Sequence, residues 1–138
     1  MRLMLDTCAI IDLLTDIDSL SKGAQALIED PENVLFASAE SMRELVVYFN
    51  NKKLLNRYFK TSTDVLQAVE NELDIEFLPV RRNVGYAYSR LTINEEQDHR
   101  DPSDHVIISH AITERMPLLS SDTRFWFYRN QGLELIEY

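Results

Sequence analysis

Short apolar runs alternate along this chain with longer stretches in which apolar residues recur every three or four positions. Runs of the first kind predict buried strands, and the longer period predicts amphipathic helices. The predicted strands cover residues 3–5, 34–37, 75–78, 118–119 and 133–136. Because strands that alternate with helices form parallel sheets covered on both faces, we expect an α/β fold with about five strands.

Helices are predicted between these strands. They cover residues 7–14, 21–28, 38–50, 62–73, 83–93, 104–114 and 122–129, and the basic stretch 52–58 is expected to be helical too. Helix 38–50 has an apolar face with the spacing i, i+3, i+4 and i+7, made by Met42, Leu45, Val46 and Phe49. Ser38 is placed to cap this helix, and the sequence Ser62-Thr63-Asp64 to cap helix 62–73. Residues 94–103 are expected to form a polar loop.

The composition indicates one globular domain. The chain has 138 residues, of which 45% are hydrophobic and 27% charged, so it is long enough to bury a substantial core. No stretch approaches the roughly 20 apolar residues of a membrane-spanning helix. Cys8 is the only cysteine, and the apolar part of the N-terminus is too short for a signal peptide. We therefore expect a cytoplasmic protein that makes no use of a membrane.

The net charge of −9 argues at first against a nucleic-acid binder, because phosphate contacts need Lys and Arg. Two interpretations remain open. The protein never meets nucleic acid, or a divalent metal inverts the field at an acidic site while clustered cations contact the backbone. The cations available for that are Lys52, Lys53, Arg57, Lys60, Arg81 and Arg82. An acidic surface also suits a basic protein partner.

Three acids lie where predicted elements end or begin. Asp6 follows the first strand, Asp122 follows the strand at 118–119, and Asp104 opens a helix. Each is also a preferred helix cap, so one alone says little. The carboxyl ends of parallel strands converge on one crevice, however, so acids from distant parts of the chain can meet there. Oxygen ligands without a Cys/His set suit Mg²⁺ or Mn²⁺.

Two further acids are less easily placed. In Asp101-Pro102-Ser103-Asp104, the proline favours a first helical position, so Asp101 is a candidate N-cap and Asp104 a candidate third helical residue. Both would then lie near a helix N-terminus, which also attracts phosphate, and capping and functional roles both remain open. Glu44 lies on the flank of the apolar face of helix 38–50, and periodicity alone predicts that it is exposed to solvent.

Other motifs carry less information. His99, His105 and His110 lack a zinc-binding spacing, and the chain has only three glycines and no phosphate-binding loop. Cys8 is expected to be a small packed residue without a catalytic partner. The run Phe125-Trp126-Phe127-Tyr128 is expected to form a core and interface patch rather than to stack on a base.

The chain resembles the PIN domain, and within that family the VapC-type toxins of bacterial toxin–antitoxin pairs. The resemblance covers essentially the whole chain and is carried by Leu5-Asp6-Thr7, Ser38-x-x-Ser41-x-x-Glu44, residues 99–108 and Leu118-Leu119-Ser120-Ser121-Asp122. It implies a single PIN domain over residues 1–138, with a three-layer α/β/α fold. It also implies a Mg²⁺ site, with Mn²⁺ as the other candidate metal. The implied ligands are Asp6, Glu44, Asp104 and Asp122, supported by Thr7, Asp101 and Ser120.

The same resemblance implies an endoribonuclease. A metal-activated water would hydrolyse phosphodiester bonds of tRNA, rRNA or mRNA and leave a 5′-phosphate and a 3′-hydroxyl. A cognate antitoxin would cover the site, often with an Arg or Lys, and the protein would form a homodimer. The chain departs from many relatives at Cys8, where they carry Asn or His, and at Ser103 and His105, which replace Phe and Arg.

Two alternatives belong to other classes of protein. One is a non-catalytic PIN-like module that binds protein or RNA, in which the acids only cap helices. The other is a phosphoryl-transfer domain of the receiver or haloacid-dehalogenase type. The latter needs Asp-x-Asp after the first strand, where this chain has Asp6-Thr7-Cys8, and the receiver type needs adjacent acids that Arg2-Leu3-Met4-Leu5 lacks.

Overall fold

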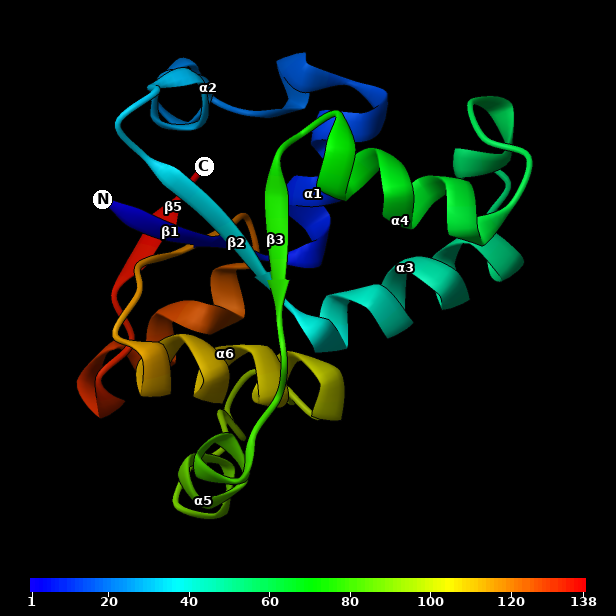
Figure 1. Cartoon of the computed structure of the whole chain (residues 1–138). Coiled ribbons are helices and arrows are strands. Elements are labelled where there is room, and N and C mark those ends of the chain that lie inside the picture. The colour runs from blue at the N-terminus through cyan, green and yellow to red at the C-terminus, as the bar shows by residue number, and fades with distance from the viewer.

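A single five-stranded parallel sheet forms the centre of the molecule in the computed structural model, which describes all of residues 1–138. Its strands are β1 (Arg2–Leu5), β2 (Val34–Ser38), β3 (Ile75–Leu78), β4 (Leu118–Ser120) and β5 (Leu135–Glu137). They lie in the order β3-β2-β1-β4-β5 (Figure 1). The strand order therefore reverses at β1, and ligands of α/β proteins bind outside the carboxyl ends of strands at such a point.

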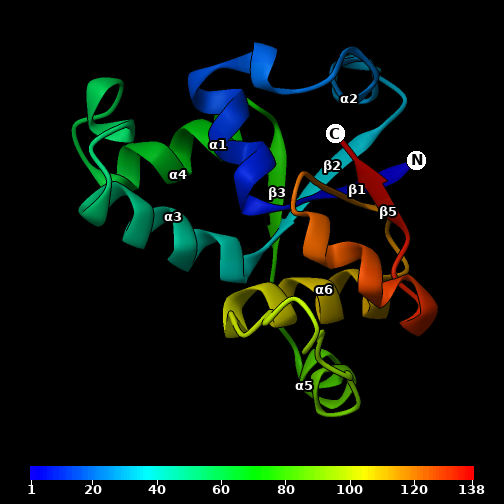
Figure 2. The ribbon, with the colours of Figure 1, turned by 180° about the vertical axis from the view of Figure 1, so that it is seen from behind.

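Helices cover both faces of this sheet, which confirms the predicted three-layer α/β/α architecture (Figures 1 and 2). One face is covered by α1 (Thr7–Thr15), α2 (Lys22–Glu29), α3 (Ala39–Asn51) and α4 (Ser62–Asn71). The other face is covered by α6 (Pro102–Glu114) and the 3₁₀ helix η3 (Thr123–Gln131), and α5 (Arg82–Ser89) packs on α6. Two short 3₁₀ helices, η1 (Ile17–Ser19) and η2 (Leu55–Arg57), complete the chain. None of the helices combines the length and apolarity needed to cross a membrane.

The two faces follow from the alternation of side chains along each strand. Leu3 and Leu5 of β1 pack with the residues of α1 to α4, whereas Met4 between them packs with α6 and η3. All three are fully buried. Truncation of such a side chain to Ala removes its burial and leaves a cavity, at a cost of about 2–5 kcal/mol. The core on both sides therefore holds the end of β1, and with it Asp6, in a fixed place.

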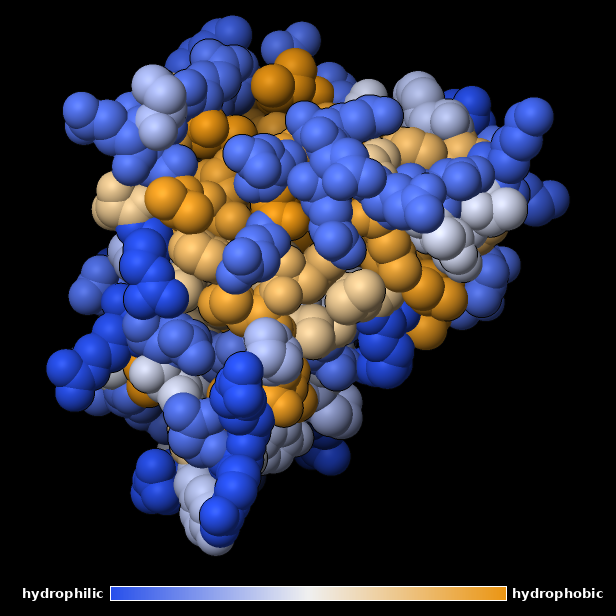
Figure 3. Space-filling model, in the orientation of Figure 1, coloured by the Kyte–Doolittle hydropathy of each residue, from blue (hydrophilic) through white to orange (hydrophobic).

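Part of the sheet on the α6 side has no helix over it. Figure 3 shows apolar side chains in the middle of the face on which Figure 1 presents β2 and β3. Val34 at the start of β2 is 53% exposed. The guanidinium of Arg2 lies 5.2 Å from the ring centroid of Phe36, which is an attractive cation–π contact. The helices of this layer thus gather toward the carboxyl ends of the strands, where the acids lie.

The chain between α3 and α4 differs from the prediction. Residues 52–58 do not continue the helix, because Lys52 adopts an extended conformation (φ −115°, ψ 138°) and only η2 forms beyond it. Leu55 is fully buried in the core, and this burial holds the chain in a turn that returns α4 against α3. The cap of α4 is Thr61, one residue before the predicted group, and it forms a capping box with Asp64.

Three other element ends also differ. Helix α5 ends at Ser89 rather than near 93, because the backbone N–H and C=O of Thr92 bond to the side chain of Gln131 instead of continuing the helix. The aromatic segment is the 3₁₀ helix η3 rather than an α-helix, and it ends at Gly132 with φ 103°. Leu133 then turns into the core, so β5 begins at Leu135, two residues later than predicted.

Candidate metal centre

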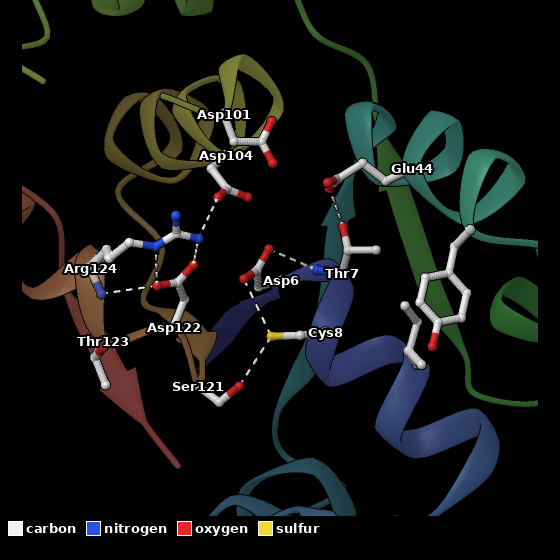
Figure 4. A pocket seen from close by; sticks show the side chains of 12 residues that line it. Asp6, Thr7, Cys8, Glu44, Asp101, Asp104, Ser121, Asp122, Thr123 and Arg124 are labelled. Carbon is white, nitrogen blue, oxygen red and sulfur yellow. Dashed lines mark hydrogen bonds and ion pairs between the residues drawn. The ribbon is translucent and has the colours of Figure 1, made fainter. Parts of the chain in front are cut away.

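A hollow of about 580 Å³ lies at the carboxyl ends of β1 and β4 (Figure 4). The side chains that line it come from α1, α3, the start of α6 and the start of η3. Its acidic residues are Asp6, Glu44, Asp101, Asp104 and Asp122. The structure therefore brings together the four acids predicted as ligands and the fifth acid predicted beside them.

Asp6 is held at the junction of β1 and α1 by bonds to both of its carboxylate oxygens. Oδ1 accepts the backbone N–H of Thr7 at 2.8 Å, which caps α1, and Oδ2 accepts the hydroxyl of Ser120 at 2.7 Å. Leu5 and Leu119 are partners in the parallel ladder, so the residues that follow them meet at the same edge. Burial raises the pKa of Asp6. Ser120 thus supports Asp6 directly.

Glu44 faces the hollow, although periodicity predicted that it would be exposed to solvent. Its carboxylate accepts a hydrogen bond from the hydroxyl of Thr7 (Figure 4). The Thr7 hydroxyl also lies 2.9 Å from the hydroxyl of Ser41. This flank of α3 is covered by polar groups of α1 instead of apolar ones, so a count of apolar residues misses it. Burial, and then the charge of Asp6, raise the pKa of Glu44.

The start of α6 matches one of the arrangements expected from its sequence. Asp101 is the N-cap and accepts the backbone N–H of Ser103 at 3.0 Å, Pro102 is the first helical residue, and Asp104 is the third. The pattern of apolar residues predicted a helix that begins at Asp104. The observed helix begins two residues earlier, at Pro102. Asp104 is 8% exposed, and burial together with the surrounding acids raises its pKa to about 8.

His99 was not predicted to belong to the site, yet it contacts Asp104 directly. Its Nε2 lies 2.9 Å from Asp104 Oδ2, and its Nδ1 lies 3.0 Å from the hydroxyl of Tyr128. That hydroxyl accepts the backbone N–H of Asn94, so its own hydrogen is free to point at Nδ1. Burial lowers the pKa of His99 to about 4 and keeps the ring neutral near pH 7. The remaining ring hydrogen is then on Nε2 and is donated to Asp104.

Arg124 is the second residue that the sequence did not reveal. Its Nε and Nη2 bond to the two oxygens of Asp122 at 3.0 and 2.7 Å, and Nη2 lies 3.7 Å from Asp104 Oδ2 (Figure 4). Asp122 also caps η3 by accepting the backbone N–H of Arg124 at 2.9 Å. Burial acts to raise the pKa of Asp122, but the hydrogen bonds and charge of Arg124 outweigh it and hold the pKa below its usual value. A cation of the chain itself therefore offsets one side of the acidic hollow.

Cys8 and the aromatic run 125–128, which the sequence analysis also considered, have structural roles. Cys8 lines the hollow, and its thiol donates to Asp6 Oδ2 at 3.4 Å. Burial, and then the charge of Asp6, raise the pKa of Cys8, so it stays a thiol. In the aromatic run, Phe125 and Tyr128 are buried in the core, as predicted, and Trp126 is 61% exposed.

The donor set fits a hard divalent cation. Asp6, Glu44 and Asp104 each offer a carboxylate oxygen, and these atoms all lie within 4.8 Å of one another. His99, Asp104 and Asp122 also lie this close to one another, but Nε2 of His99 is engaged by Asp104 and both oxygens of Asp122 are engaged by Arg124. Burial, and then the charges of neighbouring acids, raise the pKa values of Asp6, Glu44 and Asp104, and a cation placed between these carboxylates would stabilise their ionised forms. Oxygen ligands in this number suit Mg²⁺ or Mn²⁺ better than zinc.

The chain belongs to the PIN domain family, because the model of that family matches residues 3–132. It is similar in structure to VapBC2 from Rickettsia felis, solved bound to a DNA fragment from its promoter. Here the TM-score is 0.74 at 20% identity, over 99% of this chain and 98% of that one. For VapBC-5, a VapBC toxin–antitoxin system from Mycobacterium tuberculosis, the TM-score is 0.67 at 20% identity, with the same coverage.

FitAcB from Neisseria gonorrhoeae has a TM-score of 0.63 at 18% identity, over 99% of this chain and 97% of that one. No protein of curated function matches this chain. At these identities the likeness shows a shared fold. It confirms the predicted PIN-like fold and the likeness to the PIN proteins of VapBC pairs.

Proposed function

We propose that this protein is a metal-dependent endoribonuclease of the VapC type, which acts in the cytoplasm and is inhibited by a cognate antitoxin. The observation that carries the proposal is the convergence of Asp6, Glu44 and Asp104, whose ligand oxygens lie within 4.8 Å of one another. They come from the end of β1, the middle of α3 and the first turn of α6. A site of this kind suits Mg²⁺, or Mn²⁺, and the hydrolysis of phosphodiester bonds.

The capping bonds of the acids help to separate this proposal from a non-catalytic binding module. Asp6, Asp101 and Asp122 each accept a backbone N–H at the start of a helix, so capping alone would account for them. Glu44 and Asp104 cap nothing. Both are nevertheless withdrawn from solvent, and burial raises the pKa of each. Burying acids that serve no cap costs stability, which supports a ligand for them at this site.

In the proposed mechanism, Asp6, Glu44, Asp104 and Asp122 would hold one or two metal ions. When bound, the metal supplies a Lewis acid that lowers the pKa of water and offsets charge on the phosphoryl oxygens. Thr7 orients the Glu44 carboxylate, which positions the attacking water and accepts its proton. Attack at phosphorus opposite the 3′-oxygen leaves a 5′-phosphate and a 3′-hydroxyl. Arg124, on the rim, offsets negative charge on the phosphoryl group.

The proposal includes a basic antitoxin and a second copy of this chain. The solved structures that this chain resembles include complexes of toxin–antitoxin systems. The chain carries a net charge of −9 and gathers five acids in one hollow, so a partner that places Arg or Lys there would gain electrostatic complementarity. A homodimer is proposed on the family resemblance.

The test is cleavage of a mixed pool of tRNA, rRNA and mRNA by the purified protein with Mg²⁺, with Mn²⁺ and with EDTA. Asp6→Asn keeps the size and capping ability of the side chain but removes a charged ligand, so we expect cleavage to be lost and the fold retained. Asp16→Asn is the matched control, because Asp16 caps η1 away from the hollow. Full activity in Asp6→Asn, or no cleavage with any metal, would overturn the proposal.

A further inference from the structure

A second hollow opens beside the acids, between α3 and the start of α6. It has a volume of about 320 Å³ and shares three lining residues, Glu44, Tyr48 and Asp101, with the metal centre. The two hollows therefore adjoin one another at these residues. The lining that belongs to the second hollow alone comes from α3, its C-cap and α6, and consists of Arg43, Val47, Asn51, Lys52 and Ser103.

The chain around the far end of this hollow has an unusual charge. Residues 45–63 contain no Asp or Glu, although the chain has 23 acids. The same stretch contains four of the 14 cationic residues, which are Lys52, Lys53, Arg57 and Lys60. A cation at a helix C-terminus such as Lys52 is favoured by the helix dipole, which explains one Lys but not an acid-free run of this length. Lys52 is the member of this run that lines the hollow, and there it is a cationic counterpart of the acidic centre.

An RNA chain at the metal centre needs such a counterpart. Five acids repel the phosphates on either side of the cleaved bond, so cations outside the centre have to hold the strand. Arg43 is already engaged by Glu40, whereas Lys52 forms no ion pair. Tyr48 is half-buried against the core and lines both hollows, so the part of its ring that faces them can serve as a platform on which a base stacks.

We propose that single-stranded RNA runs from the metal centre along α3 through the second hollow, with a base on Tyr48 and a phosphate against Lys52. The inference rests on the proposed nuclease function and names the path of its substrate. Glu44 and Lys52 are eight residues apart on α3 and its C-cap, which at 1.5 Å per residue is about 12 Å. A strand stacked at roughly 3.4 Å per nucleotide would place about three nucleotides along this length.

The path is tested by the binding of a short fluorescent single-stranded RNA, measured by anisotropy at several salt concentrations. Asp6→Asn serves as the background, so that the RNA stays intact. Lys52→Ala should weaken binding about 3–10-fold and reduce the slope of log K against log salt by about 0.7, the value for one phosphate contact. Lys22→Ala is the matched control, because Lys22 is exposed at the start of α2 and lines neither hollow.

The stacking contact is tested separately. Tyr48→Leu keeps an apolar side chain on α3 but removes the aromatic face, and we expect it to weaken binding by about five-fold or more. Tyr48→Phe keeps the ring and should bind as the background does. Both variants should give the circular dichroism spectrum of the folded background protein.

The outcomes separate the path from the function. If the wild type cleaves RNA while Lys52→Ala and Tyr48→Leu retain the affinity and salt dependence of the Asp6→Asn background, the path is wrong and the nuclease proposal stands. The same result is expected if the second hollow serves a protein partner instead. If the wild type neither binds nor cleaves RNA, the proposed function fails and the path fails with it.

Discussion

The Nε2 atom of His99 lies 2.9 Å from Oδ2 of Asp104, and this bond fixes the orientation of a buried acid whose pKa is raised to about 8. The imidazole is itself held by the hydroxyl of Tyr128 at 3.0 Å and packs against Phe125 and His105. Donation to Oδ2 leaves Oδ1 to face the other acids. A histidine that orients a carboxylate ligand in this way acts from behind the site, and such partners commonly determine metal affinity.

His99→Phe should lower the affinity for Mn²⁺ about 10–100-fold, because Asp104 loses the donor that orients it. The hydroxyl of Tyr128 loses its partner too, so the free energy of unfolding should fall by about 1–3 kcal/mol. Calorimetric titration with Mn²⁺ and urea denaturation would measure the two effects. His110→Phe is the control, because His110 is buried on α6 and bonds to Ser38 outside the hollow. Equal Mn²⁺ affinity in His99→Phe and the wild type would show that Asp104 needs no such donor.

The stability of the metal-free protein should fall as the pH rises from 6.5 to 8. Folding raises the pKa of Asp104 from 3.8 to about 8, so the folded state binds more protons than the unfolded chain between these values. Asp6 and Glu44, whose pKa values are also raised, act in the same direction. Folding lowers the pKa of His99 from 6.5 to about 4, so its opposite effect is complete above pH 6.5.

Urea denaturation in EDTA would measure this slope, which for one proton is at most about 1.4 kcal/mol per pH unit. In Asp104→Asn the group cannot ionise, so the decline should become shallower and the variant should be more stable than the wild type at pH 8. Saturating Mg²⁺ should remove the decline in the wild type, because the metal binds the ionised carboxylate. Parallel pH profiles for the two proteins without metal would contradict the perturbed ionisation of Asp104.

Arg124→Gln should bind Mn²⁺ more tightly than the wild type. The guanidinium occupies both oxygens of Asp122 and approaches Asp104, so it competes with a metal for the same charges. Because Arg124 is partly exposed, the gain should be modest, roughly five-fold for an ion pair worth up to about 1 kcal/mol, and smaller at high salt. Arg129→Gln removes a charge from the same 3₁₀ helix outside the hollow and should leave the titration unchanged.

Thr7→Val should lower kcat for RNA cleavage about 10-fold or more, with little effect on KM. The valine keeps the shape of the side chain at the start of α1 but loses the hydroxyl that bonds to Glu44. Thr7→Ser keeps the hydroxyl and should retain most of the activity. Single-turnover cleavage at saturating RNA would make the comparison, and a Val variant as active as the Ser variant would show that Glu44 needs no orienting bond.

The strands could be predicted because their signal is local. Each contains a short apolar run, and four of the five predicted strands fall within a residue of their observed bounds. The ends of helices depend on distant contacts. The chain leaves α3 at Lys52 because Leu55 is drawn into the core, and α5 stops at Ser89 because Gln131, far along the chain, binds the backbone of Thr92. The periodicity of apolar residues gives no information about either contact.

The residues of the site likewise divide into those that local sequence signals predict and those that depend on distant contacts. Asp6 and Asp122 follow neighbouring parallel strands, so strand alternation alone indicates that they converge. Glu44 could be placed only by the family resemblance, since its partner Thr7 is polar and leaves no apolar periodicity on that flank of α3. His99 and Arg124 reach the acids through a loop and a 3₁₀ helix, whose conformations follow from tertiary packing. The one sign of this in the sequence was the presence of His99 in the polar loop just before Asp101.

The bond between Asp6 and Ser120 joins the first strand to a residue 114 positions later. Strand β4 begins at Leu118, so it can join β1 only after the 117 residues before it have been synthesised. A chain still emerging from the ribosome therefore carries Asp6 and Glu44 without Ser120 or Asp122 beside them. If the centre cleaves RNA and requires Asp122, as proposed, the growing polypeptide would stay inactive toward the message and ribosome that are making it. Activity would then begin only after β4 has paired with β1, at the stage when the proposed antitoxin could bind the folded protein.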